Sequence, residues 1–184
     1  MPQFSASDDR VRTRRLVLFG LLGLVLCTPQ VLIANPWAAV SAPSRGPAEV
    51  IGSASNGCVG GAQSLPEVGP GYVSVRRARN RFYGHPDLLR LISALGQAAA
   101  RRGDGLVLIG DLSQPRGGRM PSSHRSHQHG LDVDVWFTLA PSPAAARRLM
   151  DDQPDPPSMV EPGGQTTSAA WGEPQRALLE SAAR

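Results

Sequence analysis

Histidine and aspartate side chains gather in one short stretch, PSSHRSHQHGLDVDVW, at residues 121–136. It contains three of the four histidines of the chain, followed by two aspartates. These residues are His124, His127, His129, Asp132 and Asp134. Imidazole nitrogens and carboxylate oxygens are protein ligands of zinc and similar divalent cations. The stretch therefore predicts a metal site, which the rest of the chain must position.

The spacing indicates which of these side chains meet. His127 follows His124 by three positions, and Asp134 follows His127 by seven. A loop can turn both imidazoles toward the start of the next strand, which brings the carboxylate to the same point. Two nitrogens and one oxygen around an ion leave a position for water or substrate, and such an ion activates water for peptide hydrolysis. The spacing leaves open whether His129 or Asp132 also contacts the ion. The structural alternative is a polar loop whose histidines only cap backbone groups.

One helix stands out among the elements that must position this site. Residues 86–102 begin with a proline and Asp87, end with two arginines, and are followed by Gly103. Proline suits the first helical position, opposite charges suit the two ends of the helix dipole, and glycine suits the stop. Leucine and isoleucine recur at helical spacing, which predicts a core-packing helix. We expect His85, just ahead of it, to cap or pack rather than to bind a ligand.

Two strands are expected to flank the histidines. Residues 105–111 form an apolar run typical of a buried strand, and residues 131–137 alternate between polar and apolar. The alternation places Asp132 and Asp134 on one face of the second strand. Together these elements predict an α+β fold, in which helices flank a small, partly antiparallel sheet.

The other elements are shorter. We expect a strand over residues 72–75 and helices over residues 141–150 and 173–184. Residues 42–61 are rich in glycine, serine and proline and predict an extended entry segment, with Asn56 and Gly57 as turn formers. Residues 151–167 predict a loop.

The N-terminal residues 1–42 have the pattern of a targeting segment. Four arginines precede the apolar run of residues 16–26, and Val40, Ser41 and Ala42 offer a small-residue cleavage site. The apolar run is shorter than the about 20 residues that a membrane-spanning helix needs. We therefore expect an exported, periplasmic protein that meets the membrane only through this segment, with a folded domain over residues 43–184. An uncleaved anchor is the alternative.

The charge of the chain gives no reason to expect a nucleic-acid partner. The net charge is only +4, and from residue 43 onward arginines exceed acidic residues by little. Residues 76–83 (RRARNRFY) are the most basic stretch. They predict a solvated surface with two aromatic rings tucked in, and the alternative is a rim that meets an anionic polymer.

The histidine stretch resembles the metal motif of penicillin-insensitive murein endopeptidases, in the lysostaphin and D-Ala-D-Ala metallopeptidase group. The resemblance rests on SHRSHQHGLDVDVWF and on four further segments. These are GSASNGCVGGAQ (residues 52–63), PGY (70–72), RNRFYGHPDLL (79–89) and GDLSQPRGGRM (110–120). It implies a metallopeptidase-like fold and an exported zinc enzyme without a serine nucleophile. The implied substrate is peptidoglycan, at its D-alanyl to meso-diaminopimelyl cross-links.

Individual positions carry this resemblance further. His127 and Asp134 match zinc ligands of the family, and His124 matches a neighbouring histidine that also lines the metal site. Arg116 lies in the loop expected to approach the substrate. We hypothesise that it holds a substrate carboxylate or stabilises the developing oxyanion as a catalytic residue.

The sequence also departs from the family pattern. The resemblance implies a third ligand and a catalytic base from a downstream His-x-His segment, whereas no histidine follows His129. The domain is therefore expected to be incomplete at its C-terminus, which would also leave Cys58 without the C-terminal cysteine implied as its partner. The alternatives are a truncated, non-catalytic remnant that binds metal or cell wall, and a D,D-carboxypeptidase or dipeptidase. A zinc-binding exported protein without wall affinity is a further one.

Overall fold

The computed structural model describes residues 35–121, 124–152 and 155–184. Residues Asn35–Arg184 form one compact unit. Most of the predicted targeting segment, residues 1–34, lies outside the described residues, whereas residues 35–42 belong to the compact unit. Within the described ranges, no helix combines the length and the apolar character needed to cross a membrane.

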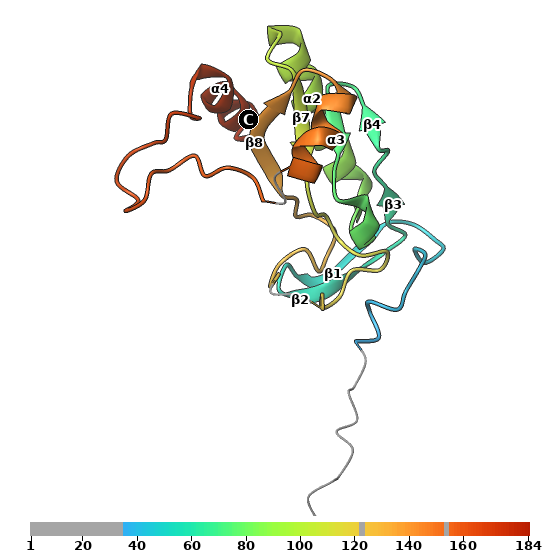
Figure 1. The fold of residues 1–184 in the computed structure, drawn as a ribbon. Coiled ribbons are helices and arrows are strands. Elements are labelled where there is room, and N and C mark those ends of the chain that lie inside the picture. Colours follow the sequence, from blue (N-terminus) through green and yellow to red (C-terminus); the bar gives the residue numbers. More distant parts are fainter. Residues whose placement is uncertain (1–34, 122–123, 153–154) are drawn as a thin grey trace, which may run out of the picture. The chain divides into compact units, whose positions relative to one another are not determined.

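A four-stranded mixed sheet forms the centre of this unit (Figure 1). Its strands, in spatial order, are β4 (Val68–Gly69), β5 (Tyr72–Ser74), β7 (Leu106–Ile109) and β8 (Val135–Ala140). The two outer pairings are antiparallel, whereas β5 and β7 are parallel. Parallel neighbours need a crossover connection, and helix α2 (Pro86–Arg102) supplies it. The predicted α+β fold with a partly antiparallel sheet is confirmed.

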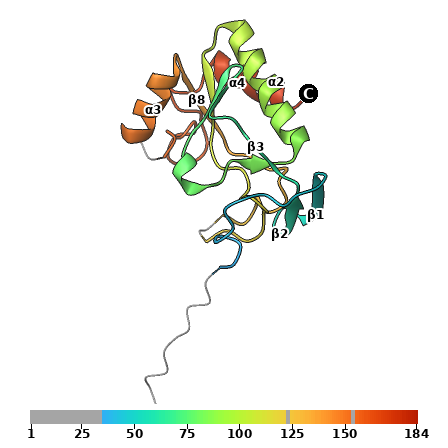
Figure 2. The ribbon, with the colours of Figure 1, turned by 90° about the vertical axis from the view of Figure 1, so that its right-hand side faces the viewer.

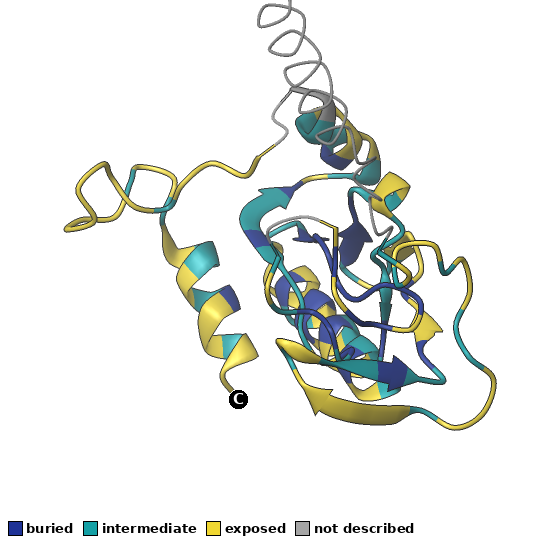
Figure 3. Cartoon of the chain, turned by 90° about the horizontal axis from the view of Figure 1, so that it is seen from below, coloured by how far each residue is buried: buried dark blue, intermediate teal, exposed yellow. Residues whose placement is uncertain are grey.

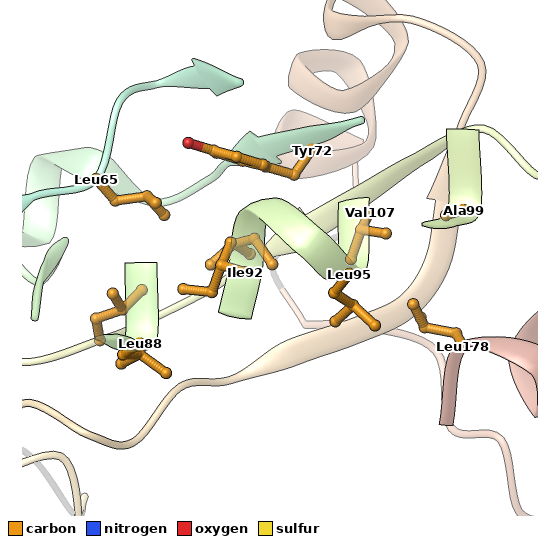
Figure 4. Close-up of a cluster of buried hydrophobic side chains, with 10 residues drawn as sticks. Leu65, Tyr72, Leu88, Ile92, Leu95, Ala99, Val107 and Leu178 are labelled. Carbon is orange, nitrogen blue, oxygen red and sulfur yellow. The ribbon is translucent and has the colours of Figure 1, made fainter. Parts of the chain in front are cut away.

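The two faces of the sheet carry separate apolar cores. On one face, Val107 of β7 packs with Ile92 and Leu95 of α2 and with Leu178 of α4 (Glu173–Ala182), as Figure 4 shows. On the other face, neighbouring strand residues pack against α3 (Pro143–Asp152). Figure 2 shows α2 and α3 on opposite sides of the strands. Each large side chain buried in this way contributes roughly 1.5–3 kcal/mol to the stability of the fold. The two cores together hold the sheet in place, and with it the edge of the sheet where the site lies.

Helix α2 has the predicted bounds and ends. Its first turn is capped by His85, whose Nδ1 accepts a hydrogen bond from the backbone N–H of Asp87 at 3.3 Å. Gly103 ends the helix at φ 78°, a left-handed conformation that glycine adopts without strain. The prediction that His85 caps or packs is confirmed. Helix α4 is mostly exposed in Figure 3, where it lies next to the C-terminal mark, and it buries Leu178.

The entry segment forms a hairpin that the sequence analysis missed. Strand β1 (Glu49–Ser53) pairs antiparallel with β2 (Asn56–Gly60), and the turn between them lies at Ala54 and Ser55. The predicted turn at Asn56 and Gly57 is therefore wrong, because both residues belong to β2. Every residue of β1 is exposed, so the segment lacks the buried apolar face that makes a strand recognisable from sequence. Two short elements pair beside it, β3 (Gln63–Ser64) and β6 (Tyr83–Gly84).

The strand after the histidines begins later than predicted. Strand β8 starts at Val135 and continues to Ala140, whereas the alternating pattern predicted residues 131–137. Asp134 still pairs with the segment that follows β7, because its N–H donates to the carbonyl of Asp111 and its carbonyl accepts from the N–H of Gly110. Asp132 lies before this pairing, in the loop. The two aspartates that alternate in sequence therefore have different surroundings.

Candidate metal centre

His127 and Asp134 form the closest pair among the predicted ligands. His127 Nε2 lies 3.3 Å from Asp134 Oδ1, and the His127 ring is almost fully buried. Two ligand atoms bound at zinc–ligand distances of about 2.0–2.1 Å in a tetrahedron are themselves about 3.3 Å apart. The separation between these two atoms therefore suits a shared zinc ion.

His124 lies beside this pair. Its Nε2 is 4.0 Å from Asp134 Oδ2, and its ring centroid is 5.5 Å from that of His127. The structure thus brings the side chains of His124, His127 and Asp134 together, from a loop and from the residue that precedes β8. The donor set of two imidazoles and one carboxylate is chemically suited to zinc.

Asp111 is a fourth member of the cluster and was not selected from the sequence. It lies two residues beyond the end of β7, with 2% of its side chain exposed, and its Oδ2 is 2.9 Å from His124 Nε2. One ligand atom each from Asp111, His124 and Asp134 lie within 4.8 Å of one another. One feature of the sequence could have identified it. Asp111 ends the apolar run of residues 105–111, and a carboxylate at the end of a buried strand lies at the edge of the sheet where a site can form.

Two arginines favour the ionised form of the Asp111 carboxyl group. Arg81 Nη1 and Arg79 Nη1 lie 2.9 Å and 3.1 Å from the same Oδ2 that contacts His124. Burial acts to raise the pKa of Asp111, but the hydrogen bonds and charges of the two guanidinium groups outweigh it and hold this pKa below its usual value. Asp111 is therefore an ionised carboxylate whose charge is already matched by neighbouring cations.

His127 has an unusual backbone conformation, and Asp132 is in contact with it. His127 has φ 66°, in the left-handed region, where a non-glycine residue costs roughly 1–3 kcal/mol. Its backbone N–H donates to Asp132 Oδ2 at 3.0 Å, and its ring Nδ1 lies 3.5 Å from the same oxygen. Gln128, the next residue, donates its N–H to Ala54 and accepts from Gly118. The loop is thus held on both sides of the histidine.

The electrostatics of His127 favour a bound cation. Burial acts to lower the pKa of His127, but the hydrogen bond and charge of Asp134 and the charge of Asp132 outweigh it, so that this pKa is raised. Asp132 in turn has a lowered pKa, since its burial is outweighed by the Ser126 side chain and by His127. The same two carboxylates that favour a proton on His127 also favour a metal cation next to it.

Among the described residues, neither His129 nor Arg116 contacts the cluster. His129 Nδ1 is buried, and within the described ranges it has no hydrogen-bond partner. Arg116 is exposed, and its Nε donates to the carbonyl of Ala42 at 3.3 Å. The role hypothesised for Arg116 therefore remains a prediction.

The basic run of residues 76–83 makes internal contacts. Arg76 lies over the Trp136 ring at 4.8 Å from its centroid, and Arg77 lies over Phe82 at 3.7 Å. Arg79 and Arg81 contact Asp111, as described above. The two aromatic rings are half-buried and stack on each other, and the guanidinium groups anchor the run to the sheet and to the cluster.

Cys58 is a free thiol of intermediate exposure in β2. The only other cysteine of the sequence, Cys27, lies outside the described residues. The C-terminal partner implied by the resemblance therefore stays a prediction.

Comparison with known proteins agrees with the motif. A family model described as "Penicillin-insensitive murein endopeptidase" matches residues 50–184. A protein of that name from Yersinia enterocolitica is 40% identical over 156 residues, which are 85% of this chain and 56% of the relative. One from Yersinia pestis is 39% identical over 91% of this chain and 60% of its own length. One from Klebsiella pneumoniae is 41% identical over 74% of this chain and 49% of its own length.

The chain thus spans about half to three fifths of the length of these relatives. The family model covers well over half of the chain, including nearly all of the hairpin, helix α2, the histidine loop and the C-terminal helix. The chain belongs to the penicillin-insensitive murein endopeptidase family.

Proposed function

We propose that this chain carries the zinc site of an exported murein endopeptidase, which hydrolyses D-alanyl to meso-diaminopimelyl cross-links of peptidoglycan. The observation that carries the proposal is the 3.3 Å separation of His127 Nε2 and Asp134 Oδ1, with His124 beside them. The names of the relatives support the substrate class, because all of those compared are called murein endopeptidases.

Two donor sets compete for the ion, and charge favours one. Asp111, His124 and Asp134 have ligand atoms within 4.8 Å of one another, whereas His127 and His124 each approach a different oxygen of Asp134, at 3.3 Å and 4.0 Å. However, both arginines that contact Asp111 lie within 3.1 Å of its Oδ2. A divalent cation at that oxygen would be repelled by two guanidinium groups. We therefore assign His124, His127 and Asp134 as ligands and Asp111 as a supporting residue.

Zinc fits this donor set, and when bound it supplies a Lewis acid that polarises a carbonyl and lowers the pKa of water. The role of the other residues of this chain is to hold and orient the side chains that would bind zinc. His127 is fixed by its buried loop and Asp134 by its pairing next to β7. The Nε2 atom of His124 contacts Asp111 in this structure and would leave that contact on binding zinc. Arg116, which precedes two glycines in its loop, is proposed to receive a carboxylate of the substrate.

We assign no general base to the described residues. The family resemblance implies that the base and a third family ligand come from a His-x-His segment, and no such pair follows His129 in this sequence. The proposed site of action is the periplasm, where peptidoglycan lies. The arginine-rich, apolar pattern of residues 1–42 supports export.

The alternative is a chain that binds metal or cell wall without turnover. It is supported by the described residues, among which we assign no general base. A D,D-carboxypeptidase or dipeptidase would use the same metal chemistry on a different peptide. Its product, free D-alanine or a dipeptide, separates it from an endopeptidase.

The test is digestion of purified cross-linked muropeptide dimers by the full chain. Any conversion of dimers to monomers by this chain should stop with a chelator and return with zinc. His127→Ala should abolish it, whereas Asp104→Asn, at a surface ion pair with Arg102, should leave it unchanged. Zinc binding without loss of dimers would support the non-catalytic alternative, and release of D-alanine would support a carboxypeptidase. Absence of zinc binding would overturn the proposed metal site.

A further inference from the structure

Asp132 contacts His127 at two points through one oxygen. Its Oδ2 accepts the backbone N–H of His127 at 3.0 Å and lies 3.5 Å from the ring Nδ1. The Nδ1 atom is buried and forms no hydrogen bond with the described residues at this separation. An approach of a few tenths of an ångström would bring it into the range of an N–H···O hydrogen bond, about 2.7–3.2 Å.

The two nitrogens of His127 therefore face two different carboxylates. Nδ1 lies near Asp132, whereas Nε2 lies 3.3 Å from Asp134 Oδ1. A neutral imidazole carries its proton on one nitrogen and a lone pair on the other. Both carboxylates attract the ring proton, and Asp132 is the one that favours it on Nδ1. If a metal ion takes the place of a proton between Nε2 and Asp134, the ring proton has to lie on Nδ1, where Asp132 faces it.

The same contact supports the backbone of the histidine. His127 has φ 66°, and its N–H points to Asp132 in this conformation. Without an acceptor, this N–H would lose its partner in a loop where the ring is nearly fully buried. Asp132 thus supports both the backbone conformation that places the ring and the tautomer that the ring adopts.

This geometry also separates the roles of the two aspartates. They are two residues apart in sequence. The backbone of Asp134 pairs with Asp111, which follows β7, whereas Asp132 lies in the loop before strand β8. The carboxylate of Asp132 lies at the Nδ1 side of the ring, away from the nitrogen that faces Asp134. It is placed to orient a ligand rather than to be one.

We propose that Asp132 is a positioning residue for His127, which holds the imidazole with its proton on Nδ1 and its Nε2 lone pair presented to the metal. This inference rests on the metal site of the proposed function. Carboxylates behind metal-bound histidines raise the basicity of the ligand and fix its ring, and their removal typically weakens metal binding about 10–100-fold.

The experiment compares the full chain with Asp132→Asn, Asp132→Ala and the control Asp104→Asn. Zinc affinity is measured by competition with a chromophoric chelator. The tautomer of His127 is read in the metal-free chain at alkaline pH, by NMR of the imidazole nitrogens. Asparagine retains an oxygen for the backbone N–H but lacks the negative charge, so it separates the charge effect from a general loss of folding.

We expect the fraction of His127 protonated on Nδ1 to be higher in the unsubstituted chain than in the Asp132 variants, because Asp134 attracts a proton to Nε2 in all of them. Asp132→Asn should weaken zinc binding several-fold, and Asp132→Ala should weaken it about 10–100-fold, with a shift of the tautomer toward Nε2–H. Asp104→Asn should match the unsubstituted chain. Unchanged zinc affinity and an unchanged tautomer in both Asp132 variants would overturn the inference. If the unsubstituted chain fails to bind zinc, the proposed metal site fails, and the tautomer measurement still decides the role of Asp132.

Discussion

The Oδ2 atom of Asp111 lies 2.9 Å from His124 Nε2 and within 3.1 Å of guanidinium nitrogens of both Arg79 and Arg81. This one buried oxygen joins the end of β7, the basic run before α2 and the histidine loop. The three segments are separated in sequence, so this contact determines how the candidate metal centre is held against the sheet.

Asp111→Asn is therefore expected to destabilise the fold. The substitution keeps the size of the side chain but removes the charge that Arg79 and Arg81 face, and hydrogen bonds to charged groups are worth about 1.5–3 kcal/mol. We expect the free energy of unfolding to fall by about 2 kcal/mol, measured by urea denaturation in the presence of a chelator. Asp104→Asn is the control, because its partner Arg102 is near the surface and such pairs contribute about 0–1 kcal/mol. Equal effects of both substitutions would contradict the role of Asp111.

The pH dependence of that difference follows from the lowered pKa of Asp111. A carboxyl group whose pKa is lower in the folded state stabilises the fold above its unfolded pKa, about 3.9 for aspartate. This contribution is lost as the pH falls through the lower folded value. The stability gap between the chain and Asp111→Asn should thus be constant near neutral pH and shrink in acid below about pH 4. Urea denaturation over a pH series with chelator measures it, and a gap that widens in acid would refute the assignment.

Substitution of individual histidines separates ligands from neighbours. His127→Ala removes the nitrogen nearest to Asp134, and His124→Ala removes the second imidazole, so each should weaken zinc binding by at least 100-fold. His129→Ala should leave it within a few-fold, because no contact of His129 with the cluster is found among the described residues. Isothermal titration with zinc measures these affinities. Strong loss of zinc binding in His129→Ala would reassign the ligand set.

Helix α2 and strand β7 were predictable because local patterns and packing agree. Residues 86–102 have a proline start, a glycine stop and apolar side chains at helical spacing, and the apolar run after them is buried on both faces. Each signal is local, and the fold requires nothing that contradicts it. The ligand candidates His124, His127 and Asp134 were recognisable for a similar reason, since the types and spacing of their donor groups are written in one short stretch.

Asp111 and the β1–β2 hairpin were not predictable in this way. The role of Asp111 depends on Arg79 and Arg81, which approach it only through the tertiary fold. Strand β1 is exposed along its whole length and has no alternating apolar face. The distinct role of Asp132 was not predictable either. Strict alternation put it on the same strand face as Asp134, whereas in the structure it lies in the loop and accepts the N–H of His127, which has a left-handed backbone conformation.

The buried face of α2 should carry most of the stability of the sheet. Ile92 is 1% exposed and packs in the core with Leu95 and Val107, whereas Leu91 on the same helix is 49% exposed. Ile92→Ala removes buried methyl groups and leaves a cavity, so we expect a loss of about 2–5 kcal/mol. Leu91→Ala should change stability by about 0.5 kcal/mol or less. Thermal and urea unfolding measure both, and similar losses for the two variants would contradict the burial of this face.

Gly117 tests the link between the Arg116 loop and the histidine loop. It has φ 68°, and a Cβ atom at this position would meet the carbonyl oxygen of Gln128 at 1.9 Å. Gly163 has φ 106° and no atom within 4 Å of such a Cβ, so alanine there introduces the backbone strain without the collision. Gly117→Ala should therefore destabilise the fold by more than Gly163→Ala and also weaken zinc binding, because Gln128 follows His127 directly and its displacement moves the ligand. Urea denaturation and zinc titration of both variants provide the comparison. A Gly117→Ala variant that loses stability but binds zinc normally would show that the two loops are packed together without being coupled at the metal centre.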